Sequence, residues 1–203
     1  MKEKTKFNSL GKYFIELIIV FFGVYGAFLL NEYNLESQNQ IKREQISEGL
    51  IKEITDVVNR TDRVSKILPQ IINYYDSLIA SGEMPSLEPR IEPVKVESHM
   101  WEASLESGVI DLFEVPLIFK ISEFYNELNS GLEQINQLRI LSETILIPNL
   151  NKPKSEFYNI KTGKLKEKYF WYFAGLKNLT TIAERISAKG YELKGILESS
   201  MIR

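Results

Sequence analysis

One acidic residue, Glu16, lies inside an otherwise uncharged stretch that runs from Tyr13 to Leu30. A carboxylate in the middle of a lipid bilayer is costly unless it is paired, protonated or facing water. The residue therefore has two interpretations. As an acid in the first turn of a helix, it would be satisfied by the positive helix end and by Lys12, four residues earlier. As a functional group, it would lie in a contact between membrane spans or on an ion path within an oligomer.

A second group of candidate ligands consists of His99, Glu102 and Glu106, which are spaced to share one face of a helix. One histidine with two acids is an ordinary pattern on a solvated helix, so we predict no metal site there. His99 is the only histidine in the chain, and cysteine is absent. The absence of cysteine excludes thiolate nucleophiles, disulfides and thiolate metal sites.

The rest of the sequence contains no glycine-rich phosphate loop and no Ser-His-Asp set. We therefore predict that the protein is not an enzyme and has neither catalytic residues nor a cofactor. The net charge is −2, from 25 basic and 27 acidic residues. This balance leaves no basic stripe for phosphate backbones, so we expect no nucleic-acid partner. The length of 203 residues suits one globular domain plus one appended segment.

The apolar stretch from Tyr13 to Leu30 has the length and composition of a membrane span. As a helix it would be roughly 27 Å long, close to the ~30 Å hydrocarbon core of a bilayer, and both of its faces are apolar. A cleaved signal peptide and a buried core helix are the alternatives. The stretch is long for a signal peptide, and its only cluster of small residues is followed by bulky ones, which makes a poor cleavage site. We predict an uncleaved transmembrane helix at residues 13–31.

The distribution of basic residues predicts the orientation of this helix. Four lysines lie in residues 1–12, whereas the sequence after the helix reads NEYNLESQNQ before Lys42 and Arg43 appear. Basic residues near a span favour the cytoplasmic side. We therefore predict a cytoplasmic N-terminus at residues 1–12 and an exported C-terminal domain.

Small and polar residues follow one side of the predicted span. Glu16, Gly23, Ala27 and Asn31 are separated by seven, four and four residues, so they lie roughly along one face of a helix. Gly23 and Ala27 form a small-x-x-x-small pair, which allows two helix backbones to approach closely. This face predicts self-association, with membrane lipid and further copies of the chain as partners.

The same residues carry a resemblance to a known group of proteins. The pattern Glu16-x6-Gly23-x3-Ala27-x3-Asn31, followed by Tyr33-Asn34, is similar to the opening signature of an uncharacterised family of short single-span membrane proteins from Bacteroidetes-type bacteria. That family usually has tryptophan where Tyr33 stands. Its second motif, an aromatic residue followed by a leucine and then a Ser-Gly pair, resembles the segment around Trp101, Leu105 and Gly108.

The resemblance covers most of the chain but not the region from about Lys152 to Lys168. It implies an N-terminal membrane anchor and a helical domain outside the membrane. It supplies no activity and no functional residues beyond the two motifs.

Beyond a polar helical neck at residues 32–45, apolar residues recur at intervals of three and four, which is typical of amphipathic helices. The pattern predicts three long helices and a short one. The first runs from Ile46 to about Ser81, with a kink or restart at Pro69. The others are Leu117 to about Ile147, Tyr169 to about Glu198, and the short helix from His99 to about Ser107.

We expect Ser98 to cap the short helix at its N-terminus and Gly108 to end it. Trp101 and Leu105 would share a face packed against the bundle core. The fold class is therefore all-α: one transmembrane helix that continues into an antiparallel helical bundle at residues 46–203.

Two connections and one aromatic run complete the prediction. Residues 81–97 contain three prolines at four-residue spacing and are expected to form a crossing loop, with an extended segment at residues 94–96. Residues 159–164 are expected to form a small hairpin or a simple turn. The run Tyr169–Phe173 is interpreted mainly as core, with membrane-surface contact and a ligand site as alternatives.

The leading functional hypothesis is a membrane-anchored helical scaffold or accessory subunit that holds an unknown protein partner beside the inner membrane. Two alternatives come from other classes. The first is an oligomeric channel or ion-coupled assembly that uses Glu16. The second is a sensory domain that binds a small ligand between its helices.

Overall fold

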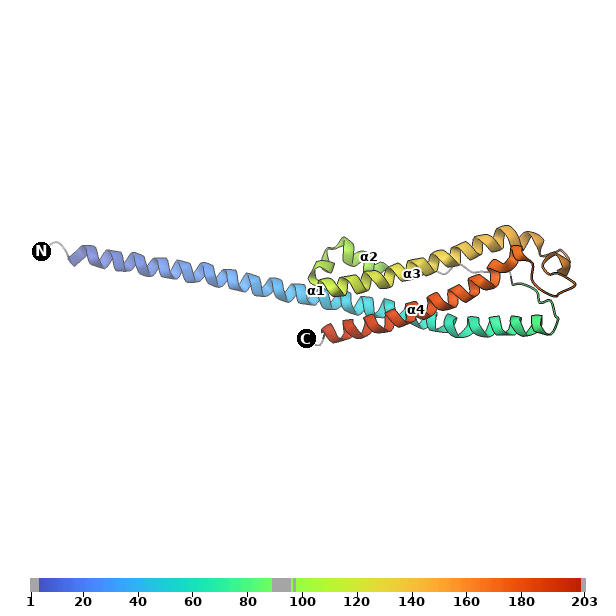
Figure 1. The fold of residues 1–203 in the computed structure, drawn as a ribbon. Helices are drawn as coiled ribbons and strands as arrows, with labels where there is room; N and C mark the ends of the chain where they lie inside the picture. Colours follow the sequence, from blue (N-terminus) through green and yellow to red (C-terminus); the bar gives the residue numbers. More distant parts are fainter. Residues whose placement is uncertain (1–3, 89–95, 97, 202–203) are drawn as a thin grey trace. The chain divides into compact units, whose positions relative to one another are not determined.

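A computed structural model of the chain describes residues 4–88, 96 and 98–201, with side chains described from residue 13 onward. The described residues form an all-α fold of three long helices and one short one (Figure 1). These are α1 (Lys4–Ala80), α2 (His99–Glu106), α3 (Val115–Leu141) and α4 (Phe170–Met201). The predicted fold class is therefore confirmed. The chain divides into two compact units, residues 1–45 and 46–203.

The first unit contains the N-terminal part of α1. The large apolar side chains between Tyr13 and Leu30 are all exposed. The most apolar 18-residue window has a mean hydropathy of 2.2, and none of it is buried within the chain. The protein thus has one N-terminal helix that is long and apolar enough to cross a membrane.

In the second unit α1 continues through Pro69 and ends at Ala80. Of the two expected alternatives at Pro69, a kink or a restart, the restart is wrong, because α1 is one continuous helix. Buried side chains attach it to the bundle on both sides of the proline, among them Val58 before it and Ile72 after it. The helix ends in a Schellman turn at Gly82, whose φ is +82°. The Glu83 amide donates to the Leu78 carbonyl at 2.9 Å, which is the six-residue bond of that motif.

In the bundle α1 and α3 run in the same direction, and α4 is antiparallel to both (Figure 1). Side-chain contacts agree with this order, since Thr61 of α1 meets Ser187 of α4 and Tyr75 meets Tyr172. The predicted extended segment at residues 94–96 lies largely outside the described residues. The described part of the connection is packed, with Leu87 buried.

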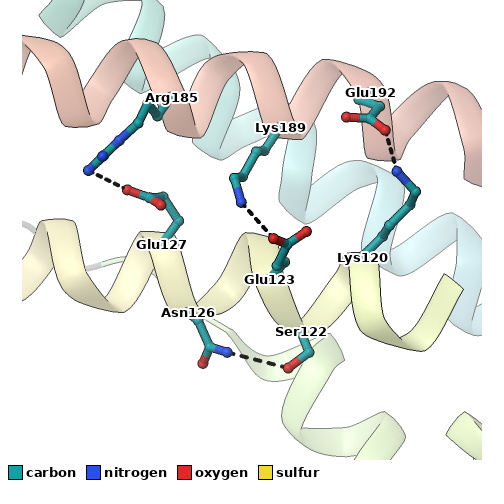
Figure 2. A network of polar contacts seen from close by, with 8 residues as sticks. All are labelled: Lys120, Ser122, Glu123, Asn126, Glu127, Arg185, Lys189 and Glu192. Carbon is teal, nitrogen blue, oxygen red and sulfur yellow. Dashed lines mark hydrogen bonds and ion pairs between the residues drawn. The ribbon is translucent and has the colours of Figure 1, made fainter. Parts of the chain in front are cut away.

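Three ion pairs join α3 to α4 (Figure 2). Lys120 pairs with Glu192, Glu123 with Lys189 at 3.2 Å, and Glu127 with Arg185 at 2.8 Å. The partners step along the two helices in opposite directions, which fixes the antiparallel register. Because these pairs are largely solvated, each adds at most about 1 kcal/mol to stability.

The main core of the second unit is built from one face of each long helix. Gly190 of α4 lets that helix approach Val58 of α1, and Gly131 of α3 lies against Ile182 and Ile186. The fully or nearly fully buried aliphatic side chains are Leu50, Ile54, Val57, Val58, Ile121, Leu128, Ile182, Ile186, Leu193 and Leu197.

A second core lies at the loop end of the bundle and consists of Leu87, Leu146, Tyr158, Leu165, Tyr169 and Tyr172. After α3 the chain continues as a π-helical segment, η2 (Ser142–Leu146), and a 3-10 turn, η3 (Ile147–Asn149). This continuation places Leu146 in the second core. The interpretation of the aromatic run as core therefore holds for Tyr169 and Tyr172. It is wrong for Phe170, which is 54% exposed.

The loop before α4 is tied to this second core by Tyr158, whose hydroxyl donates to the Pro85 carbonyl at 2.6 Å. Burial, and secondarily the nearby Tyr75, raise the pKa of Tyr158 to about 12. The loop itself forms a small hairpin, since Tyr158 and Leu165 make an antiparallel bridge. The Asn159 amide donates to the Lys164 carbonyl at 2.8 Å, and Gly163 provides a positive φ of +67°.

The close approach of α1 and α4 predicts opposite effects for two glycine substitutions in α4. In Gly190→Ala the new Cβ would lie 2.4 Å from Val58 Cγ2 and 3.1 Å from Phe124 Cε2. Val58 is a buried, β-branched residue, so we expect a loss of about 1–3 kcal/mol in the free energy of unfolding. In Gly195→Ala the Cβ meets nothing within 4 Å. That variant should gain about 0.5–1 kcal/mol from helix propensity.

Denaturant unfolding of the full chain in detergent, followed by circular dichroism, measures both changes. Equal stability of the two variants would contradict the packing of α4 on α1.

Candidate functional site

The four residues of the predicted self-association face lie on α1 within the first unit. The side chains of Glu16, Ala27 and Asn31 are exposed, and a Cβ built on Gly23 would meet no atom within 4 Å. Since these residues are helical and separated by seven, four and four positions, they share one side of α1. The structure thus leaves this face open to lipid or to another helix. The ion path through Glu16 stays a prediction.

The second predicted motif lies on α2 and is attached to the bundle through Trp101. Its indole ring stacks on the Tyr125 ring with 5.4 Å between centroids and an interplanar angle of 7°. Trp101 is partly buried against the main core, as expected. The stacking joins α2 to α3.

A carboxylate on α1 completes this attachment. Glu53 Oε1 accepts a hydrogen bond from the Tyr125 hydroxyl at 2.6 Å, and its Oε2 accepts one from the Met100 amide at 2.9 Å. One carboxylate therefore holds the side chain of an α3 residue and the backbone of the first turn of α2. Hydrogen bonds to charged acceptors are the stronger ones in proteins. We call Glu53, Tyr125, Met100 and Trp101 the α2 clamp.

Burial, and next the hydrogen bond to the Glu53 carboxylate, raise the pKa of Tyr125 well above its usual value. The phenol therefore stays protonated at physiological pH and acts only as a donor. The Glu53 carboxylate accepts both hydrogen bonds, so the α2 clamp joins α1, α2 and α3.

The structure corrects the expected role of Leu105. Its side chain is 48% exposed, and Ser104 is the fully buried residue of α2, with its hydroxyl donating to the Trp101 carbonyl at 2.6 Å. The helix is rotated so that positions 101 and 104, not 101 and 105, face the bundle. Gly108 does end the helix region with a φ of +69°, which is unfavourable for other residues.

Ser98 is the N-cap residue of α2, but its side chain makes no hydrogen bond to the helix backbone. Its hydroxyl donates instead to Glu102 Oε1 at 2.6 Å. Glu102, His99 and Glu106 are all exposed. Among the described residues, no group of three or more His, Cys, Asp or Glu side chains is placed to hold a metal ion.

Two polar ties between α1 and α4 were not predicted. Thr61 Oγ1 lies 2.7 Å from Ser187 Oγ, and the Tyr191 hydroxyl donates to Asp62 Oδ2 at 2.6 Å. Hydrogen bonds from the Ser187 and Tyr191 hydroxyls lower the pKa of Asp62. The pairs are separated by more than a hundred residues in sequence, so no local pattern points to them.

An apolar cavity of about 90 Å³ lies between α1, α3 and α4. The sequence does not predict it. Two small residues, Gly131 and Ala183, contribute to its lining. The cavity is small compared with the roughly 300–1,000 Å³ of ordinary ligand pockets. Its lining is Val57, Arg60, Thr61, Val64, Val96, Leu128, Gly131, Leu132, Ile135, Leu179, Ile182, Ala183 and Ile186.

Neither a protein-family model, a curated protein nor a solved structure matches this chain. The resemblance to the single-span bacterial family therefore stays a prediction based on its two motifs.

The α2 clamp predicts a specific cost for removing one hydroxyl. Tyr125→Phe keeps the ring that stacks on Trp101 but removes the hydrogen bond to Glu53 Oε1. We expect the free energy of unfolding to fall by about 1.5–3 kcal/mol, as for a hydrogen bond to a charged group. Tyr191→Phe is the matched control, because it removes an equally short bond between exposed partners and should cost less than about 1 kcal/mol. Chemical denaturation of both variants tests this, and similar midpoints would show that the clamp contributes no more than a surface contact.

Proposed function

We propose that this protein is a membrane-anchored helical interaction module, without catalytic activity, that self-associates through its N-terminal helix. The observation that carries this proposal is the exposed apolar surface of α1 between Tyr13 and Leu30. A core helix of a soluble protein would bury such a surface within its own chain. Here none of the most apolar window is buried, so the surface needs lipid or another protein to cover it.

The basic residues support a cytoplasmic N-terminus in the inner membrane and an exported bundle. Four lysines precede the apolar stretch, whereas the first basic residues after it are Lys42 and Arg43. The positive-inside tendency favours this orientation.

The charged groups of the bundle support an interaction role, because they link its helices to one another. Glu53 holds α2, and the pairs at Lys120, Glu123 and Glu127 join α3 to α4. These carboxylates and amines serve to connect helices. A domain that has its own core, and whose helices are linked by ion pairs and hydrogen bonds, is suited to presenting a fixed surface to a partner.

Membrane anchoring predicts resistance to alkaline extraction. The full chain should stay with the membrane pellet after a carbonate wash. A variant with Val20→Arg and Val24→Arg should be released, since each arginine near the middle of a span costs about 2.5–3.5 kcal/mol on insertion scales. Release of the unaltered chain would refute the anchor.

The partner is tested by crosslinking in intact cells, with the full chain compared with a chain that ends at Gln45. The full chain should capture a protein that the shorter chain does not. If both capture the same set, the bundle is not the interaction module.

A second candidate function is sensing of a small apolar ligand, and the observation that favours it is the cavity lined by Gly131 and Ala183. Arg60 and Thr61 are part of the lining, but its surface is almost entirely apolar, and apolar cavities can bind small hydrocarbons. A ligand of this kind, with benzene as the probe, should raise the melting temperature of the full chain. Ala183→Leu should abolish the shift by filling the cavity. An unchanged melting temperature in benzene would remove this candidate.

A further inference from the structure

We propose that residues 147–170, which we call the loop end, bind the surface of an anionic lipid bilayer. The inference does not depend on the proposed anchor or on its orientation. It is carried by an exposed apolar residue at the tip of the small hairpin and by the lysines around it.

The tip of the hairpin carries a side chain that its turn does not require. The Asn159 carbonyl accepts hydrogen bonds from the Thr162 amide at 3.2 Å and the Gly163 amide at 2.8 Å. Asn159 Oδ1 also accepts one from the Lys161 amide at 3.0 Å. Ile160 lies inside this turn and is 58% exposed. Turns usually have Gly, Pro, Asn, Asp or Ser at such positions. The turn is thus formed by other residues, and the Ile160 side chain is available for an outside contact.

The hairpin is attached to the start of α4, so its tip has a fixed place. The Phe157 and Tyr169 rings lie 5.0 Å apart between centroids. The Lys166 amide donates to the Phe157 carbonyl at 2.8 Å, and Lys168 forms an ion pair with Glu156. A segment that is already ordered loses little conformational entropy when it binds a surface.

Further apolar side chains of the loop end are exposed. They are Ile147 of η3, Leu150 directly after η3, and Phe170 at the start of α4. Figure 1 shows the segment between α3 and α4 at one end of the bundle, away from α2. Apolar side chains gathered on an exposed surface and surrounded by polar ones mark an interaction site.

The loop end has a positive charge. It contains six lysines and two acids. The hydrogen bond from Lys168, and with smaller effects the charges of Lys152 and Lys166, lower the pKa of Glu156, so these three lysines lie around one carboxylate. Apart from the ion pair between Lys168 and Glu156, one acid remains, Glu167. The five other lysines are Lys152, Lys154, Lys161, Lys164 and Lys166.

The neighbouring connection from α1 reduces this charge but does not reverse it. Tyr158 holds Pro85 of that connection beside the hairpin. Its described acids are Glu83 and Glu88. With both counted, five lysines still stand against three acids.

The choice of lysine favours a bilayer over an acidic protein as the partner. The sequence has no arginine between Arg139 and Arg185. Protein interfaces are enriched in arginine and depleted in lysine, and arginine is the residue that binds carboxylates with two parallel hydrogen bonds. Clustered lysines attract anionic headgroups by charge alone, and an apolar tip gains further by burial at the headgroup boundary. The loop end has both features.

Vesicle flotation of the full chain, held in nanodiscs of pure phosphatidylcholine, measures this contact. The probes are phosphatidylcholine vesicles with or without about 30 mol% phosphatidylglycerol. The chain should bind the anionic vesicles at least about tenfold more tightly than the neutral ones, as expected for several lysines near a charged surface. High salt should weaken the binding, because it screens exposed charges.

Two variants test the residues at the tip. Ile160→Ser removes the apolar side chain and should weaken binding about tenfold. Lys161→Gln with Lys164→Gln removes two charges and should weaken it by at least about tenfold. Matched controls make the same changes at exposed positions outside the loop end: Phe119→Ser, and Lys52→Gln with Lys66→Gln. They should bind as the unaltered chain does. Unchanged melting by circular dichroism separates a lost contact from a lost fold.

Three results would overturn the proposal. One is equal binding of the unaltered chain to neutral and anionic vesicles, a comparison that needs no variant. Another is full binding by Ile160→Ser, since attraction by charge alone would serve any anion. The third is binding to poly-L-glutamate beads with the same losses in both variants, which would assign the loop end to an acidic protein.

Discussion

The constraint on which the rest of this structure depends is that the apolar side chains of residues 13–30 are not buried by any part of the chain that the structure describes. Burying one large apolar side chain contributes about 1.5–3 kcal/mol. Burial of the whole stretch would therefore contribute tens of kcal/mol, which contacts within the described chain do not provide. A bilayer or an apolar surface of another protein would supply that free energy. The unit at residues 46–203 has two buried cores of its own.

The two cores of the bundle differ in construction. The main core is formed by regularly spaced faces of α1, α3 and α4, and close approach is possible where Gly131 and Gly190 remove the Cβ. The second core is made largely by loop residues and tyrosines, whose hydroxyls need partners when buried. Tyr158 finds one in the Pro85 carbonyl. The π-helical segment η2 carries Leu146 into this core. Apolar packing thus supplies most of the stability, and the ion pairs between α3 and α4 mainly select the register.

Much of the architecture could be predicted because long amphipathic helices repeat their signal many times. Each of the three long helices shows its buried face in several turns, so a single mismatch, such as Phe170, does not change the result. The eight residues of α2 offer only two turns. There Trp101 fits two rotations of the helix equally well, and the contacts with Tyr125 and Glu53 select the one that buries Ser104 and exposes Leu105. Such contacts join residues 47 and 72 positions apart, and nothing in the local sequence marks them.

The polar residues of the bundle and those of the first unit differ in their surroundings. In the bundle, polar groups such as Glu53 and Asp62 are engaged with hydroxyls or amides of neighbouring helices, so their chemistry is used to hold the fold. In the first unit the polar residues Glu16 and Asn31 lie exposed on a helix face beside lipid-compatible side chains. Polar side chains within membrane spans pair with one another or with backbone carbonyls, or face water. This exposed face is the part of the chain on which the proposal of self-association is based.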